Sequence, residues 1–134
     1  MVRIGIDAMG GDHAPDVVVE GALAALKELG KESRVVLFGD KPAIEGAIRE
    51  AGIALAPFDV VHTTEVIGMT DHAAKAYGQK TDSSIRVGFE YLKEKKIDGF
   101  ASAGSTGAML VGAMTSCGTI RNVIRPGISA LVAT

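Results

Sequence analysis

The chain has 134 residues, of which 47% are hydrophobic and 22% are charged. This balance is typical of a folded globular domain and excludes a disordered chain. The 14 basic and 16 acidic residues give a net charge of −2 without a long block of either sign, so no nucleic-acid partner is expected.

No apolar stretch reaches the roughly 20 residues that a membrane span needs. The amino terminus arrives at Asp7 too early to contain the apolar segment of a signal peptide. The single cysteine, Cys117, has no partner for an internal disulfide bond, which fits a reducing compartment. These features predict a soluble cytoplasmic protein.

The first third of the chain alternates predicted strands and helices. Residues 2–6 are an apolar run typical of a buried strand, with Asp7 at its carboxyl end. Hydrophobic residues at helical spacing then predict a helix that begins near Pro15 and ends at Gly30. A second strand is predicted over residues 34–38.

The middle of the chain continues the alternation. A helix that Gly52 closes follows the second strand, and residues 58–62 are predicted to form a third strand. Residues 63–80 are predicted to be mostly loop, with Asp71 placed to cap a short helix that reaches Tyr77.

The last third contains one more helix and strand before a strongly apolar segment. Asp82 or Ser83 is placed to cap a helix, and residues 99–101 form the fourth predicted strand. Residues 106–117 predict a helix that is apolar on nearly every face and must be enclosed by neighbouring helices or another subunit. Residues 128–133 resemble a fifth strand.

The alternation of strands and helices predicts an α/β fold: a parallel sheet with helices on both faces, in three α/β/α layers. Because the sequence stops at the predicted fifth strand without a closing helix, we expect the domain to be truncated.

Two glycine loops, at residues 8–15 and 102–107, each follow a predicted strand and lead into a predicted helix. In a parallel sheet such loops share one edge, where helix N-termini offer N–H groups to an anion and glycine allows close approach. The second loop nearly matches a nucleotide-binding P-loop, but Ser105 replaces its lysine, and no dinucleotide-binding glycine motif follows the first strand. A site for phosphate or a phosphoryl group is the functional interpretation, and ordinary turn chemistry is the alternative.

Asp7, Asp12 and His13 are candidate acid, base or orienting groups at the same edge. The alternative is that Asp12 caps the following helix and His13 bonds only to backbone. Lys80 with Ser83 and Ser84 could add a cation and donors to an anion site, or form a solvated turn and an N-cap. The histidines and the cysteine do not have metal-ligand spacing, so no metal is expected.

The strings IDAMGGDHAP at residues 6–15 and SAGSTGA at residues 102–108 together resemble the PlsX family, the phosphate acyltransferases of bacterial fatty acid and phospholipid synthesis. The resemblance covers all 134 residues. Other positions that match the family pattern are Gly39, Asp40, Glu65, Val66, Ile67, Asp71, Ala76, Lys80, Ser83, Ser84, Arg125 and Pro126.

Three positions depart from the family pattern. Ser105 stands where asparagine is common, Ala73 where proline is common and Gly78 where arginine is common. Ser105 keeps a hydrogen-bond donor. The absence of an arginine at Gly78 removes a possible phosphate clamp from residues 71–80.

The resemblance implies transfer of a long acyl group from acyl carrier protein to inorganic phosphate, which yields an acyl-phosphate for phospholipid synthesis. It also implies an architecture similar to isocitrate and isopropylmalate dehydrogenases, a homodimer and no cofactor. Family members are longer, so residues 1–134 correspond to the N-terminal part of a single catalytic domain. The resemblance leaves open whether this part is active on its own, and any peripheral membrane association would come from the missing half.

The catalytic hypothesis places phosphate beside the thioester carbonyl, where orientation and oxyanion stabilisation supply most of the rate. Competing hypotheses are a short-chain phosphotransacylase that uses coenzyme A, and a non-catalytic phosphate-binding or dimerisation fragment. The candidate catalytic residues are Asp12, His13 and Asp7, and the candidate phosphate or substrate residues are Gly10, Gly11, Gly104, Ser105, Thr106, Gly107, Lys80, Ser83 and Ser84.

Overall fold

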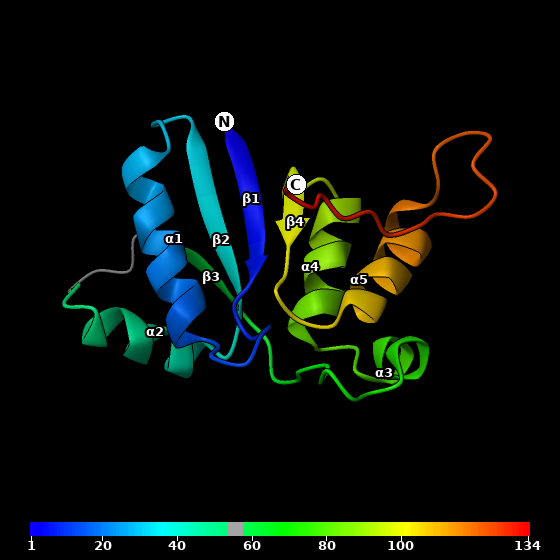
Figure 1. Ribbon diagram of the computed structural model, residues 1–134. Helices are drawn as coiled ribbons and strands as arrows, with labels where there is room; N and C mark the ends of the chain where they lie inside the picture. The colour runs from blue at the N-terminus through cyan, green and yellow to red at the C-terminus, as the bar shows by residue number, and fades with distance from the viewer. Residues whose placement is uncertain (54–57) are drawn as a thin grey trace.

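Four parallel strands form one sheet in the order β3-β2-β1-β4 (Figure 1). The computed structural model describes residues 1–53 and 58–134. All four strands run in the same direction, so their carboxyl ends share one edge of the sheet. The strands are β1 (Val2–Asp7), β2 (Ser33–Gly39), β3 (Asp59–His62) and β4 (Gly99–Ala101).

The register of the sheet brings the ends of β1 and β4 together. Strand β1 pairs with β2 along its whole length, and on its other side only Ile4, Gly5 and Ile6 pair with β4. Ala101 ends β4 opposite Ile6, one residue before β1 ends. The loops that follow these two central strands therefore begin side by side.

Helices α1 and α2 cover one face of the sheet, and α4 covers the other (Figure 1). No helix in the described ranges is long and apolar enough to cross a membrane. The helices are α1 (Asp16–Glu28), α2 (Lys41–Glu50), α3 (Ala73–Gln79), α4 (Ser84–Lys93) and α5 (Thr106–Gly112), which continues as the π-helical segment η1 (Ala113–Cys117).

Alternating side chains of β2 supply the two halves of the core. Val35 and Leu37 pack with α1 and α2, whereas Val36 and Phe38 pack on the α4 side. The Phe38 ring meets Tyr91 of α4 edge-on, with ring centroids 5.1 Å apart. A strand buried on both faces is the signature of a parallel α/β sheet, and the predicted α/β class is confirmed.

Helix α5 packs on α3 and α4 rather than on the sheet. A Cβ atom at Gly112 would lie 2.2 Å from the Phe89 ring, so this glycine allows the close contact between α5 and α4. The predicted helix over residues 106–117 forms, but neighbouring helices do not enclose its second half, and cover by another subunit stays a prediction. The helix changes to π geometry at η1, and Met114 and Cys117 are exposed because only one side of this segment packs on α4.

The connection from residue 63 to 80 contains a better defined helix than predicted. Helix α3 is capped by His72, whose ring accepts a hydrogen bond from Lys75 N. Asp71 is not the cap. Its carboxylate instead accepts hydrogen bonds from Gly68 N and from the Lys80 ammonium group, and these stronger partners explain the difference.

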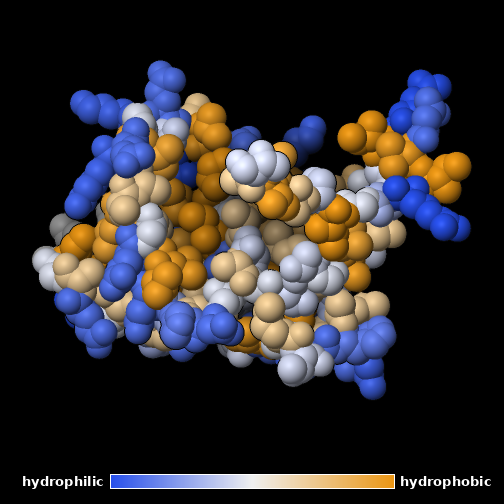
Figure 2. All heavy atoms as spheres, in the orientation of Figure 1, coloured by the Kyte–Doolittle hydropathy of each residue, from blue (hydrophilic) through white to orange (hydrophobic). Residues whose placement is uncertain are grey.

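The predicted fifth strand over residues 128–133 is wrong. Ile128, Leu131 and Val132 are exposed, and this segment pairs with no described strand. Figure 2 shows apolar atoms on the segment that projects beyond η1, where Ile120 and Ile124 are more than four-fifths exposed. An apolar run becomes a strand only when a neighbouring backbone satisfies its N–H and C=O groups, and that requirement is nonlocal.

Candidate functional site

The two glycine loops meet at the carboxyl edge of the sheet. A Cβ atom built on Gly10 would lie 2.7 Å from Gly104 N, and one built on Gly104 would lie 3.1 Å from Gly10 Cα. Gly11 has a φ of +100°, and a Cβ atom built on it would lie 3.6 Å from Ala103. Backbone packed this closely leaves no room for a side chain at Gly10, so glycine is a steric requirement at this contact.

Asp7 and Ser102 tie the two loops together beneath this contact. Asp7 ends β1, and its side chain accepts hydrogen bonds from Met9 N at 3.0 Å and from the Ser102 hydroxyl at 2.7 Å. Ser102 Oγ in turn accepts from Gly104 N at 2.9 Å. The Ser102 proton is therefore engaged by Asp7 and is not free for an anion.

The start of α5 lies directly after this contact. Ser105 is buried and caps the helix, because its hydroxyl oxygen accepts from Ala108 N at 3.2 Å. Within the described ranges, the N–H groups of Thr106, Gly107 and Gly11 have no hydrogen-bond partner. These groups are among the backbone donors that remain for a ligand, whereas Gly104 N is already bonded.

The N-terminal end of α3 closes one side of the α5 start. A Cβ atom at Gly107 would lie 2.9 Å from the Ala73 Cβ, so the two helices touch at their first turns. This contact was missed from sequence, where Ala73 was noted only as a departure from the family pattern. Glycine at 107 is needed for helix packing, in addition to any part in binding.

Asp12 and His13 lie on the loop beside Gly11, and both are exposed. Neither side chain has a hydrogen-bond partner among the described residues, and α1 begins after Pro15 without a side-chain cap. The alternative in which Asp12 caps α1 is therefore not observed. Both side chains are open to solvent.

Lys80 follows the last residue of α3, and it forms a separate cluster with Asp71. Its ammonium group donates to Asp71 Oδ2 at 2.8 Å and to the Val66 carbonyl at 2.7 Å. The hydrogen bond from Lys80, aided by Gly68 N, holds the pKa of Asp71 below its usual value. The charge of Lys80 is already paired, and no described hydrogen bond or ion pair links it to the glycine loops.

Ser83 and Ser84 are buried at the start of α4. The Ser83 hydroxyl oxygen accepts from Arg86 N at 3.2 Å, so Ser83 rather than Asp82 is the helix cap. Ser84 N donates to the Glu65 carbonyl at 3.3 Å. No described hydrogen bond joins either serine to the glycine loops, and the capping alternative accounts for Ser83.

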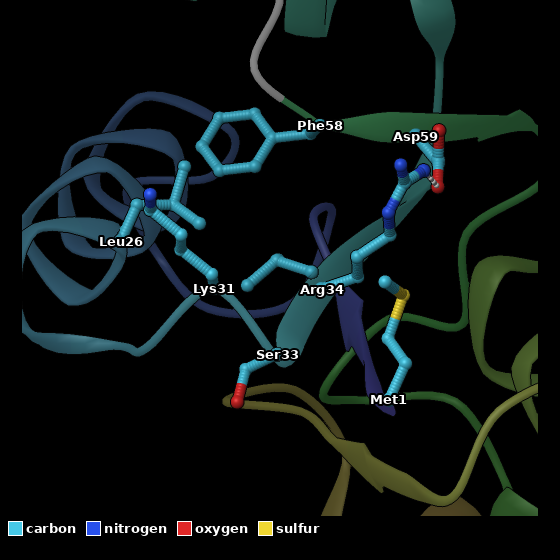
Figure 3. A pocket seen from close by; sticks show the side chains of 8 residues that line it. Met1, Leu26, Lys31, Ser33, Arg34, Phe58 and Asp59 are labelled. Carbon is cyan, nitrogen blue, oxygen red and sulfur yellow. Dashed lines mark hydrogen bonds and ion pairs between the residues drawn. The ribbon is translucent and has the colours of Figure 1, made fainter.

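A hollow lies at the opposite edge of the sheet (Figure 3). It has a volume of about 400 Å³, and the strands that line it begin there, at Ser33 and Asp59. The Arg34 guanidinium lies 3.3 Å from the Asp59 carboxylate, and both side chains are more than half exposed. Figure 3 also shows Met1, Leu26, Lys31 and Phe58 around this hollow, and none of the candidate site residues belongs to it.

The fold and the loop contact together define a class: a parallel α/β protein in which two glycine loops form one polar niche at the carboxyl edge of the sheet. The described residues contain no cluster of three His, Cys, Asp or Glu side chains that could hold a metal ion. The two loops contribute backbone N–H groups and the Gly10–Gly104 contact, and Asp12 and His13 lie exposed on the first loop.

Comparison with known proteins identifies the family. The family model described as fatty acid synthesis protein matches residues 2–134, and the chain belongs to this PlsX-type family. It is 46% identical over 128 residues to a phosphate acyltransferase of Caldicellulosiruptor bescii, an alignment that covers 96% of this chain and 38% of the relative. A phosphate acyltransferase of Dictyoglomus turgidum is 44% identical over 133 residues, which cover 99% of this chain and 39% of the relative. The chain thus spans less than two-fifths of the length of these relatives.

Proposed function

We propose that this chain contributes the phosphate site of a phosphate acyltransferase, which transfers an acyl group from acyl carrier protein to inorganic phosphate. The observation that carries the proposal is the direct contact of Gly10 with Gly104, beside exposed Asp12 and His13. Relatives named phosphate acyltransferase support the general reaction. Acyl carrier protein as the acyl donor is our own addition to the reaction that these names describe.

In the proposed reaction, free N–H groups of Gly11, Thr106 and Gly107 hold phosphate in the niche. A phosphate oxygen attacks the thioester carbonyl, the resulting tetrahedral oxyanion collapses, and the carrier thiolate leaves with a proton from solvent or a side chain. His13 and Asp12 are the groups placed to handle that proton. Orientation of the two substrates supplies much of the rate, so no covalent enzyme intermediate is needed.

The proposal extends to the organisation of the whole protein. Residues 1–134 belong to one catalytic domain with an architecture related to isocitrate and isopropylmalate dehydrogenases, which acts in the cytoplasm as a homodimer. Exposed apolar side chains such as Ile124 and Leu131 support a further packing partner for residues 118–134. Any membrane contact is assigned to segments outside this chain.

The direct test is thioester turnover by the protein as its gene encodes it. We expect phosphate-dependent cleavage of a long-chain acyl carrier protein thioester, with acyl-phosphate detected by mass spectrometry, and no cleavage when sulfate replaces phosphate. Faster cleavage of acetyl or butyryl coenzyme A would favour the short-chain transferase instead. Phosphate binding in a calorimeter without cleavage of either thioester would favour a non-catalytic binding module.

The position of the anion tests the site itself. We expect a crystal soaked in phosphate to hold the anion within hydrogen-bond reach of residues 104–107 and close to Gly10 or Gly11. An anion bound only beside Lys80 and Asp71 would contradict the proposed site and favour one next to α3.

A further inference from the structure

We propose that Ser102 and Asp7 are positioning residues, which form a clip that sets the separation of the two glycine loops. This inference rests on the proposed function above, because the loops are the proposed phosphate site. In this role Ser102 is neither a nucleophile nor a hydrogen-bond donor to phosphate. It also separates Asp7 from Asp12 and His13, with which the sequence grouped it.

The clip is a continuous chain of three hydrogen bonds. Met9 N donates to one Asp7 carboxylate oxygen, the Ser102 hydroxyl donates to the other, and Gly104 N donates to Ser102 Oγ. Asp7 and Ser102 are 95 residues apart in sequence. The chain therefore joins the loop after β1 to the loop after β4 through buried or partly buried side chains, rather than through the loops' own backbones.

The clip has no free space around it. A Cβ atom at Gly10 would lie 2.6 Å from Asp7 Oδ2, 2.7 Å from Gly104 N and 2.8 Å from Ser102 Oγ. Gly10 thus packs directly against Asp7, Ser102 and Gly104. A shift of Ser102 must move Gly10 or Gly104, and with them the N–H groups on either side of the niche.

The same geometry argues against proton transfer by Asp7. Its side chain is only 2% exposed, and both of its oxygens already accept hydrogen bonds. A substrate would have to displace Ser102 to reach it. Asp12 and His13 are exposed and unbonded among the described residues, so proton handling is left to them.

Three substitutions in the full-length protein test the clip. Ser102→Ala removes both the donor to Asp7 and the acceptor for Gly104 N. Asp7→Asn keeps the shape, one acceptor oxygen and an amide that donates to Ser102 Oγ, but it abolishes the titratable group. Ser116→Ala is the matched control, because it also loses one serine hydrogen bond, to the Tyr77 hydroxyl, on η1 away from the niche.

We expect Ser102→Ala to lower kcat/KM for phosphate about 100-fold, the scale of an ångström-sized misplacement, and to leave the KM for the acyl donor unchanged. Asp7→Asn should retain activity within about tenfold of wild type, since hydrogen bonding rather than charge is what it supplies. Ser116→Ala should match wild type. If Asp7 instead transferred the proton, Asp7→Asn would lose the most activity of the three variants.

Amide hydrogen exchange gives a readout that does not depend on catalysis. In Ser102→Ala the Gly104 amide should exchange about fivefold faster than in wild type or Ser116→Ala, because it has lost its acceptor. Unchanged Gly104 exchange overturns the clip. Turnover of Ser102→Ala equal to that of Ser116→Ala overturns the positioning role and leaves the proposed function intact, whereas wild type without any phosphate-dependent turnover overturns the proposed function alone.

Discussion

The two edges of the sheet differ in their shape and in their polar groups. The amino edge carries a hollow of about 400 Å³ with an exposed ion pair between Arg34 and Asp59 (Figure 3). The carboxyl edge is packed so tightly that Gly10 and Gly104 touch, and it encloses a buried carboxylate with every oxygen bonded. The volume of a hollow is therefore a poor guide to the functional site here, and preorganised polar groups are a better one.

The direction of the strands explains this difference. At the carboxyl edge the chain leaves β1 and β4 and turns into the first turns of helices, where unpaired N–H groups collect. At the amino edge the chain arrives from the ends of helices, which present carbonyl groups and the negative end of the helix dipole. Only the first arrangement suits an anionic substrate.

The largest expected effect is a difference in catalytic activity between variants at the two edges of the sheet. His13→Gln should lower kcat by about 100-fold or more, because it removes a group that we propose handles the proton, and the melting temperature should not change since His13 is exposed. Lys31→Gln, at the amino-edge hollow, is the control and should retain full turnover. Steady-state kinetics on the full-length protein decide, and equal rates for the two variants would remove His13 from the mechanism.

The second prediction concerns packing at the glycine contact. Gly10→Ala should destabilise the protein by about 1–3 kcal/mol, because the new methyl group meets backbone and buried polar atoms. Gly21→Ala on α1 meets nothing within 4 Å and should stabilise by up to about 1 kcal/mol. Urea unfolding of both variants measures the difference, and a Gly10→Ala protein as stable as wild type would mean that the loops are not in contact.

The third prediction is that the stability contributed by the Lys80–Asp71 ion pair depends on pH. Because Lys80 lowers the pKa of Asp71 below its usual 3.8, the ion pair contributes stability above that value and the contribution is lost as the pH falls through the lowered pKa. Asp71→Asn should therefore be less stable than wild type at pH 6, with a difference that shrinks below pH 3.8. Urea titrations at several pH values test this, and a difference that grows in acid would reverse the assignment. Lys80→Met should show the same pH pattern.

The smallest effect is expected at the amino edge itself. Arg34→Ala removes an ion pair whose two side chains are 57% and 59% exposed, so it should change stability by less than about 1 kcal/mol. Phosphate-dependent turnover should be unaffected. Thermal melts at low and high salt measure the contribution, and a large loss of activity would return the hollow of Figure 3 to consideration as a substrate site.

The strands and their order of appearance were determined by the sequence itself. Apolar runs such as residues 2–6 and 34–38, separated by helical periodicity, predicted β1 and β2 to within a residue or two at each end. These signals are local, because burial on both faces of a parallel sheet demands a continuous apolar run. The same locality placed both glycine loops after strands, and the parallel direction then predicted one shared edge.

Contacts between distant residues were decided only by the tertiary structure. The sequence placed Asp7 at the end of the first strand and Ser102 in the second glycine loop, but the hydrogen bond between them depends on β4 pairing with β1. His72 replaces Asp71 as the cap of α3 because Lys80 draws the Asp71 carboxylate away. Residues 128–133 fail to form a strand because no described neighbour satisfies their backbone. Periodicity reports what each segment is able to form, whereas hydrogen-bond partners across the fold determine what it does form.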